Sequence, residues 1–240
     1  MPQHFPGVAR YLQISRILGR QIEAGHFTAG SRLPTEHDLS RRYGVNRHTA
    51  REALRQLKDD GLVYSVRGKG TFVAHGKVLY RVSRKVRFTA AILEAGLTPG
   101  AVLLDAYQGP SDPELAARLG IEAGDRVVTL EILRSVNAIP FSLTVSTLPA
   151  GRFGDLPEFL GEGFSLYELL RERYGVEASR QSSVFEVALP EDRDVELLQI
   201  PRSIPLLVAR SLATDAEGQP VEDCVSRMRG DLGSVAVDFD

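Results

Sequence analysis

Residues 31–73 read SRLPTEHDLSRRYGVNRHTAREALRQLKDDGLVYSVRGKGTFV, and this stretch decides the fold of the N-terminal part of the chain. Thr35 is a good helix N-cap with an acidic residue three positions later, and a glycine follows the helix that it would begin. Asn46 is the next N-cap, at the start of a helix over residues 47–60. The β-rich pieces LVYSV and TFVA then flank the turn RGKG. The stretch therefore predicts two helices joined by a tight turn and followed by a two-stranded hairpin.

The predicted helix over residues 47–60 separates into two faces. One face carries alanines and leucines, which allow close packing on the preceding helices. The other face carries the basic residues Arg47, His48, Arg51, Arg55 and Lys58. A recognition helix needs this arrangement, because its apolar face docks on the protein while its first side chains enter the major groove. Arg47 and Arg51 could each make a forked contact to guanine.

Other residues of this region also suit DNA. Asn46 and Thr49 could reach base edges or phosphates. Arg67, Gly68 and Lys69 lie at the tip of the predicted hairpin, where glycine allows close backbone approach and the cations meet phosphate or the minor groove. The alternative is that the basic residues only cover a solvated helix face. The paired helices, the segregated charge and the basic hairpin occur together, which favours a winged helix-turn-helix that binds DNA.

The charge distribution along the chain supports this interpretation. Residues 1–76 hold 12 Lys and Arg against 6 Asp and Glu, whereas the whole chain has a formal charge of −2. A basic head on an acidic body predicts a polyanionic partner for the head alone. A membrane surface is the rival polyanion, but the sequence shows no lipid-anchor motif or basic insertion helix. We therefore expect double-stranded DNA as the partner and no membrane.

Length and composition limit the remaining classes. A chain of 240 residues with 43% hydrophobic and 25% charged residues is typical of two globular domains. The single cysteine, Cys224, excludes an internal disulfide and a thiolate-rich metal site. All histidines fall at positions 4, 26, 37, 48 and 75, so the body lacks a histidine for a catalytic triad or a metal site. We expect a cytoplasmic protein that is not an enzyme and needs no metal or cofactor.

The second half of the chain predicts an antiparallel-sheet α+β domain. We place a winged helix-turn-helix domain at residues 1–75, a basic linker at 76–87, and an effector-binding and dimerisation domain at 88–240. Strands dominate beyond the linker, with hairpins that turn near Asn137 and at residues 215–218. Short helices are predicted over residues 88–95, 112–120, 165–174 and 191–198.

Several residues of this domain suit a small anion. Arg87 and Thr89 flank the start of a predicted helix, whose free N–H groups and dipole favour phosphate or carboxylate. Ser165 would cap another helix. Arg134 lies in the strand LEILRSVN, where an inward guanidinium would need an anionic partner. The alternatives are an ordinary N-cap at Ser165 and an exposed strand position at Arg134.

The strand VEDCVSRM argues against catalysis. Cys224 has no histidine nearby to act as its base, and we interpret it as a core residue. Glu222 and Asp223 are adjacent in a strand and so face opposite sides, which is unsuited to a two-carboxylate acid/base site.

The N-terminal stretch resembles a known family. The run GSRLPTEHDLSRRYGVNRHTAREALRQLKDDGLVYSVRGKGTFV is similar to the DNA-binding domain of GntR-family regulators over nearly all of residues 8–74. The resemblance implies DNA contacts from Thr35, His37, Arg47, Thr49, Arg51 and Gly68. Members of the family often carry arginine or a similar long residue where His37 stands.

The body resembles the effector (UTRA) domain of the HutC subfamily, which shares the fold of chorismate lyase. The resemblance runs from about residue 78 to 238 through RKVRFTAAI, LRSVNAIPFSL, FSLYELLRERYG, IPLLVARS and PVEDCVSRMRGD. It implies ligand contacts at Thr89, Ala90, Arg134, Ser165 and Glu222. Sugar-phosphate sensors of this kind tend to have an acidic residue where Thr144 stands and an aromatic residue near Met228, so their absence argues against a sugar. Within the subfamily, RKVRF, LRSVN and SLYELLRE are most similar to phosphonate-operon repressors, which points to a small oxyanion.

These observations predict a homodimeric repressor that a small anionic effector, such as a phosphonate, releases from a palindromic operator. Two alternatives stay open from the sequence. One is a sensor of another effector, such as an amino acid, urocanate, a sugar phosphate or an acyl chain. The other is a lyase-like enzyme fused to a DNA-binding head.

Overall fold

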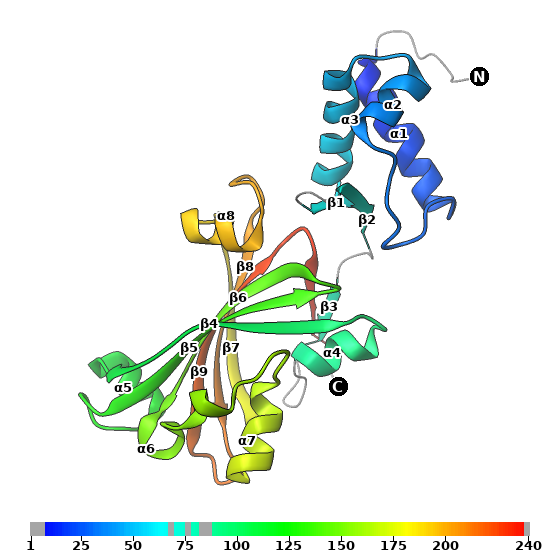
Figure 1. The fold of residues 1–240 in the computed structure, drawn as a ribbon. Helices are drawn as coiled ribbons and strands as arrows, with labels where there is room; N and C mark the ends of the chain where they lie inside the picture. Colours follow the sequence, from blue (N-terminus) through cyan, green and yellow to red (C-terminus); the bar gives the residue numbers. More distant parts are fainter. Residues whose placement is uncertain (1–7, 67–69, 75–77, 82–87, 238–240) are drawn as a thin grey trace. The chain divides into compact units, whose positions relative to one another are not determined.

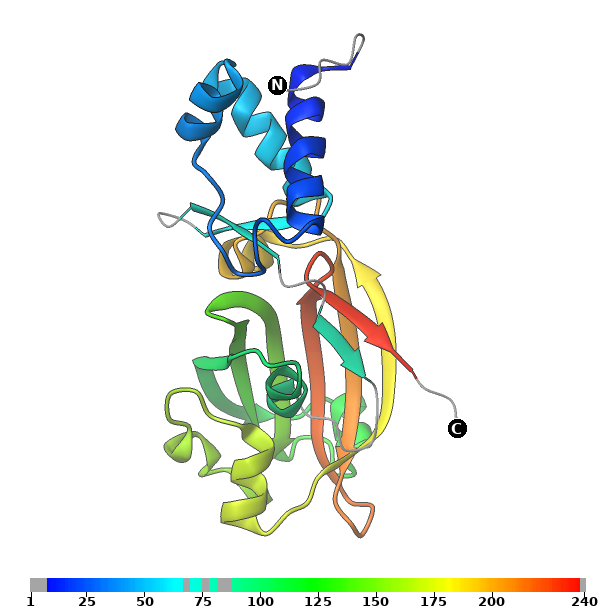
Figure 2. The ribbon, with the colours of Figure 1, turned by 90° about the vertical axis from the view of Figure 1, so that its right-hand side faces the viewer.

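The computed structural model of the chain describes residues 8–66, 70–74, 78–81 and 88–237. Two compact units make up the chain, Met1–Val78 and Leu79–Asp240. The segment predicted as a linker contains strand β3 (Val78–Arg81), which pairs with β10 (Gly233–Ala236); the two lie side by side in Figure 2. No helix in the described ranges has the length and apolar character needed to cross a bilayer.

The N-terminal unit contains three helices and a hairpin (Figure 1). They are α1 (Arg10–Glu23), α2 (Glu36–Tyr43), α3 (Arg47–Asp59), β1 (Val63–Val66) and β2 (Gly70–Val73). The predicted order of a tight helix pair and an antiparallel hairpin is confirmed.

Side-chain caps fix the boundaries of α2 and α3. Thr35 Oγ1 accepts a hydrogen bond from the Asp38 backbone N–H at 3.2 Å, and Asp38 accepts one from the Thr35 N–H at 3.2 Å. Gly44 ends α2 in the left-handed conformation, with φ of 62°. Asn46 Oδ1 then accepts from the Thr49 N–H at 2.8 Å and begins α3. These caps therefore fix where α2 ends and α3 begins, and so fix the short turn between them.

The core of this unit forms where α1 and α2 meet the apolar face of α3. Ala50 and Ala53 are fully buried there, and Leu57 is 1% exposed. Because the alanines are small, the helices approach closely and the basic face of α3 stays outside, as predicted.

The C-terminal unit is built on a six-stranded antiparallel sheet with strand order β4-β5-β6-β9-β8-β7. The strands are β4 (Pro99–Pro110), β5 (Arg126–Val136), β6 (Ile139–Pro149), β7 (Ser179–Ala188), β8 (Leu206–Thr214) and β9 (Pro220–Arg229). The predicted antiparallel α+β architecture is confirmed. Asn137 and Ala138, with φ of 50° and 63°, form the turn between β5 and β6 at the predicted place.

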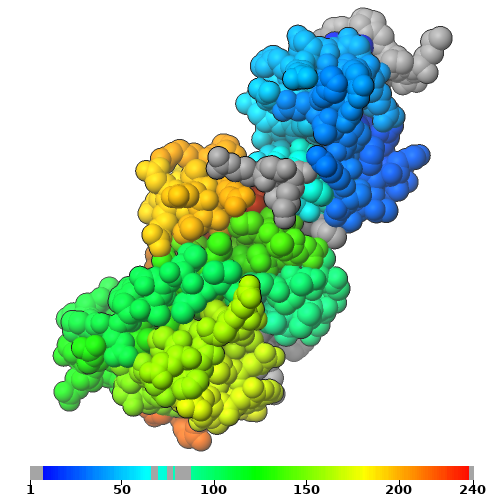
Figure 3. Space-filling view, viewed as in Figure 1, coloured from blue at the N-terminus to red at the C-terminus, as the bar shows by residue number. Residues whose placement is uncertain are grey.

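Helices cover both faces of this sheet. On one face, α6 (Ala150–Phe153), the 3-10 helix η1 (Leu156–Phe159) and α7 (Leu166–Tyr174) pack on apolar residues of β5, β6 and β4. In the space-filling view the residues of this segment lie directly against those of β4 (Figure 3). The opposite face packs against α8 (Asp192–Leu198) and α5 (Pro113–Leu119). The elements α6, η1 and β10 were not predicted, because each is four residues long and lacks the paired β-rich pieces and the turn that indicated β1 and β2. Helix α4 (Phe88–Glu94) lies near its predicted position.

An ion pair attaches α8 to the sheet. Arg227 on β9 donates from Nε to Asp194 Oδ1 at 2.9 Å, and the Asp194 residue is 2% exposed. The same carboxylate accepts the Glu191 backbone N–H at 2.9 Å and so caps the helix. Removal of this one side chain would leave a helix end without its cap, and would leave the half-buried Arg227 with only the exposed Glu191 carboxylate, 3.8 Å away.

We predict that Asp194→Ala lowers the free energy of unfolding of the C-terminal unit by about 2 kcal/mol, because it removes the cap of α8 and the nearer counter-ion of the half-buried Arg227. Asp192→Ala is the matched control on the same helix. The Asp192 side chain is 89% exposed, so its loss should cost less than about 1 kcal/mol. Chemical denaturation of the two variants checks the prediction, and equal midpoints would contradict it.

Candidate functional site

The N-terminal unit holds a groove between α2, α3 and the hairpin. Its volume is about 550 Å³, and it brings together four of the predicted DNA-contacting residues, Thr35, His37, Arg47 and Arg51. The basic residues Arg32, Arg55 and Lys58 also line it. A polar groove beside the start of an exposed basic helix is a suitable surface for a nucleic-acid backbone.

Two arginines of α3 already have partners in this groove. Arg51 donates from Nε and Nη2 to the two carboxylate oxygens of Glu36, at 2.9 and 3.0 Å. This bidentate geometry holds the guanidinium in an extended position. Arg47 Nη2 lies 3.2 Å from His37 Nδ1, so the two predicted contacts belong to one cluster.

The other predicted DNA contacts lie around the groove rather than in its lining. Asn46 and Thr49 form the cap of α3, where Thr49 Oγ1 also donates to Asn46 Oδ1 at 2.9 Å. His48 is exposed on the same turn. Arg67, Gly68 and Lys69 lie outside the described residues. Beside them, Gly70 has φ of 115°, and a Cβ there would lie 2.7 Å from Arg32 Nε, so the hairpin backbone approaches that arginine closely.

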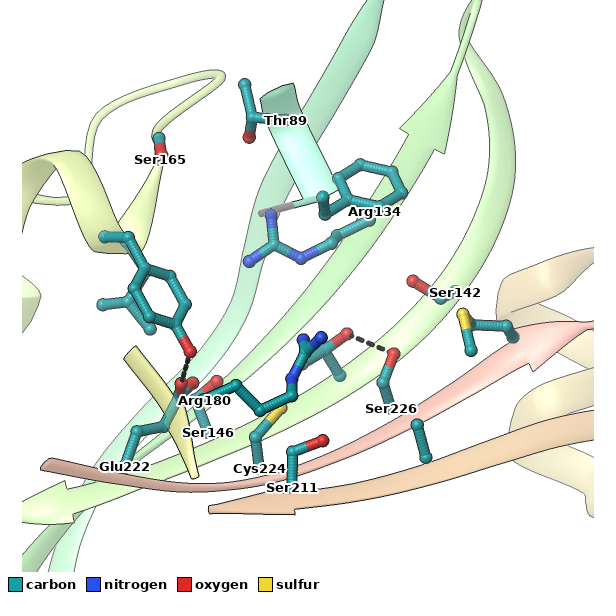
Figure 4. A pocket seen from close by; sticks show the side chains of 16 residues that line it. Thr89, Arg134, Ser142, Ser146, Ser165, Arg180, Ser211, Glu222, Cys224 and Ser226 are labelled. Atoms are coloured by element: carbon teal, nitrogen blue, oxygen red, sulfur yellow. Dashed lines mark hydrogen bonds between the residues drawn. The ribbon is translucent and has the colours of Figure 1, made fainter. Parts of the chain in front are cut away.

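A cavity of about 80 Å³ lies in the C-terminal unit (Figure 4). Its floor follows from the two-residue repeat of the strands. Alternate residues of β6 and β9 point into the cavity, namely Ser142, Thr144 and Ser146 on β6 and Glu222, Cys224, Ser226 and Met228 on β9. The register pairs Ser146 with Cys224 and Thr144 with Ser226, whose hydroxyls are 3.1 Å apart. Ser211 continues this polar surface on β8.

Two guanidinium groups enter the cavity from strands on either side of this floor. Arg134 comes from β5 and Arg180 from β7, and Figure 4 shows both side chains directed inward. Arg134 is 9% exposed, and its guanidinium lies 5.3 Å from the centre of the Phe88 ring. A buried cation surrounded by hydroxyl groups is suited to a small anion.

The starts of two helices complete the wall. Thr89 of α4 and Ser165, immediately before α7, both line the cavity, whereas Ala90 is exposed and lies outside the lining. Ser165 occupies the N-cap position of α7, but its side chain makes no capping hydrogen bond. The expectation of a side-chain cap at Ser165 was therefore wrong, because the side chain belongs to the cavity wall instead. Arg87 lies outside the described residues.

A buried acid forms one end of the cavity. Glu222 is 2% exposed, and the Tyr167 hydroxyl donates to its Oε2 at 2.7 Å. Burial, reinforced by this carboxylate, raises the pKa of the Tyr167 phenol well above its usual value. Burial likewise raises the pKa of the Cys224 thiol. Tyr167 and Cys224 are therefore neutral at physiological pH, and the other ionisable side chains of the lining are two guanidinium groups, Arg134 and Arg180, and the carboxyl group of Glu222.

The cavity gathers Thr89, Arg134, Ser165 and Glu222, four of the residues predicted for effector binding. It also shows residues that the sequence interpretation missed, chiefly Arg180, Ser142, Ser146, Ser211 and Ser226. Cys224, which we interpreted as a core residue, is half-buried and lines the cavity. A detectable signal existed, because SLTVS and EDCVS place a polar side chain at every second position of a buried strand. Within the described ranges, no three His, Cys, Asp or Glu side chains gather as a metal site requires.

Known proteins share both units. Residues 10–73 match the family of bacterial regulatory proteins named gntR, and residues 94–232 match the UTRA domain. The probable transcriptional regulator PhnF of Escherichia coli strain K12 is 31% identical over 96% of this chain and 95% of its own length. The HTH-type transcriptional repressor PhnF of Mycolicibacterium smegmatis is 29% identical over 94% of this chain and 91% of its own.

Solved structures agree with these relatives. The crystal structure of PhnF from Mycobacterium smegmatis aligns with a TM-score of 0.68 at 28% identity, and covers 95% of this chain and 99% of that one. The same order of a winged helix-turn-helix and a UTRA domain extends over both chains. The chain therefore belongs to the GntR family, and it is a DNA-binding transcription regulator of the HutC type, with a UTRA effector domain, related to PhnF.

Proposed function

We propose that this regulator is a repressor that a small oxyanion of the phosphonate class releases from its operator. The observation that carries the proposal is the small cavity of the C-terminal unit, where the buried Arg134 faces a floor of hydroxyl groups. A guanidinium and several hydroxyl donors around a small volume suit the several oxygens of a tetrahedral oxyanion.

The size and lining of the cavity argue for this ligand class over its rivals. A volume of about 80 Å³ is well below the few hundred Å³ of a drug-sized site, so long acyl chains and large rings fit poorly. Thr144 and Met228 both lie in the lining, and they stand where sugar-phosphate sensors carry an acid and an aromatic ring. The resemblance of RKVRF, LRSVN and SLYELLRE to phosphonate-operon repressors supports the same class.

The head would contact the operator through α3 and the groove beside it. Arg47 and Arg51 would read base edges, and Thr35, His37, Asn46, His48, Thr49, Arg67, Gly68 and Lys69 would hold the backbone or neighbouring bases. A homodimer would present two such helices to a palindromic site about one helical turn apart, or a multiple of it. The ligand would act by binding one state of the C-terminal unit more tightly than the other, and that state would disfavour the operator complex.

A panel of ligands should distinguish the effector class. Ethylphosphonate and inorganic phosphate should raise the melting temperature of the protein, since a ligand at 100 times its Kd adds about 2.7 kcal/mol of stability. Glucosamine 6-phosphate, urocanate, leucine and decanoate should raise it little at the same concentration. Thermal-shift measurement checks this, and stabilisation by decanoate or urocanate alone would contradict the oxyanion assignment.

Arg134→Ala should keep operator binding but weaken the response to the oxyanion. Loss of a charged hydrogen bond is worth about 1.5–3 kcal/mol, so the ethylphosphonate concentration for half-release should rise by roughly ten- to a hundredfold. The matched control is Arg210→Ala, because the Arg210 side chain is exposed and pairs with Glu186 outside the cavity. Fluorescence anisotropy with labelled operator measures both steps. Unchanged release by ethylphosphonate would remove Arg134 from the site.

Arg51→Ala should separate base reading from backbone contact. We expect a loss of about 1–3 kcal/mol on the specific operator and a smaller loss on random DNA. Lys69→Ala, expected to lose a phosphate contact, should weaken both DNAs equally. Titration of both DNAs at one fixed salt concentration measures these losses. An equal loss on the two DNAs for Arg51→Ala would contradict its role in base reading.

A further inference from the structure

A buried carboxylate is an unexpected component of a cavity for anions. Glu222 is 2% exposed, and its negative charge would repel an oxyanion in the same enclosed space. A buried carboxylate is costly unless charged or hydrogen-bonding partners satisfy it. Tyr167 donates one hydrogen bond to Oε2, which leaves acceptor capacity on a group with several lone pairs. The ligand is one source of a further donor.

The sheet register places the charged groups at two levels of the cavity. Arg134 aligns across the strands with Ser142 and Met228, whereas Arg180 aligns with Ala213 and Glu222. Met228 and Glu222 are separated by six residues of β9, which is about 20 Å along an extended strand. Arg134 and Glu222 therefore enter from opposite ends of the floor, and Figure 4 shows their side chains converging on the space between.

Arg180 makes the charge pattern asymmetric. Arg180 lies at the same level of the sheet as Glu222, so without ligand these two opposite charges partly offset each other. Arg134 then marks the end of the cavity where an anionic group binds. The lining holds two positive charges and one negative charge. A doubly charged oxyanion alone would complement both arginines but would leave Glu222 repelled. An oxyanion that carries a positive group satisfies all three side chains.

Ser146 lies between the two levels and offers a further polar contact. Its hydroxyl is fully buried and faces the thiol of Cys224, its cross-strand neighbour. A thiol is a weak hydrogen-bonding partner, so a polar ligand that crosses the floor would offer this hydroxyl a stronger one.

From this pattern we propose that the effector is a small aminoalkyl oxyanion, whose ammonium group binds Glu222 while its oxyanion binds Arg134 and Arg180. The inference rests on the proposed oxyanion function and adds the second charge of the ligand. Glu222 then selects the ligand through its ammonium group. Arg180, whose charge Glu222 partly offsets without ligand, contacts the oxyanion instead.

Three phosphonates of similar size test the proposal on the unmodified full-length protein. Calorimetric titration at pH 7.5 should give 2-aminoethylphosphonate a Kd at least about tenfold below that of ethylphosphonate, the ratio expected for a charged hydrogen bond. 2-Hydroxyethylphosphonate offers a donor without the charge and should resemble ethylphosphonate. Equal affinity for the amino and hydroxy ligands would overturn the ammonium assignment while leaving the oxyanion function intact. Binding of none of the three would overturn both proposals.

A variant pair then assigns the preference to one side chain. Glu222→Gln should reduce the advantage of 2-aminoethylphosphonate over ethylphosphonate to less than about threefold, because the neutral amide can still accept from Tyr167 but holds no charge. Asp223→Asn is the matched control, since Asp223 faces the other side of β9 and pairs with Arg118. It should keep the full preference. If Glu222→Gln weakens all three ligands equally, or keeps the tenfold ratio, Glu222 is only a counter-ion of Arg180 and the proposal fails.

Discussion

The C-terminal unit depends on the antiparallel pairing of its two central strands, β6 and β9. Because side chains alternate between faces, the register that pairs Ser146 with Cys224 sets which residues of both strands reach the cavity. A slip of one residue would turn the hydroxyls and Glu222 to the opposite face and bring Leu143 and Val225 into the cavity. Those two side chains instead pack in the apolar cluster that includes Leu198 and Val208. The hydrophobic layer on one face of the sheet therefore maintains the polar layer on the other.

Much of the fold could be predicted from local signals. Local interactions fix the caps at Thr35 and Asn46 and the turn at Asn137. Each involves only a few neighbouring residues, so the sequence alone is enough to predict it. Arg134 could be selected because a cation in a long apolar strand demands a partner wherever the strand lies. Four-residue elements such as α6 have no such signal. Such an element forms because the chain turns across a face of the sheet, and strands that are distant in the sequence build that face.

The rest of the cavity depends on long-range geometry. Arg180 lies in the edge strand β7, whose sequence SRQSSVFEVA is polar enough to pass for an exposed strand. Three strands separate β7 from β5, and only the three-dimensional shape of the sheet brings Arg180 and Arg134 to the same space. Ser165 shows the reverse error, since its position before a helix predicted a cap while the structure uses its side chain in the wall. Local preference identified the residue but not its role.

The bidentate pair between Arg51 and Glu36 has a consequence for the base contact that we propose for Arg51. A base that Arg51 contacts must displace a carboxylate that already occupies both of its donor positions. Guanine presents two acceptors in a matching fork and can make that exchange, whereas a base with one acceptor replaces two bonds with one. Glu36 therefore sets a threshold, because Arg51 would leave this carboxylate only for a partner that replaces both hydrogen bonds. On a DNA sequence without such a partner, Arg51 would stay bound to Glu36 and α3 would lack this base contact.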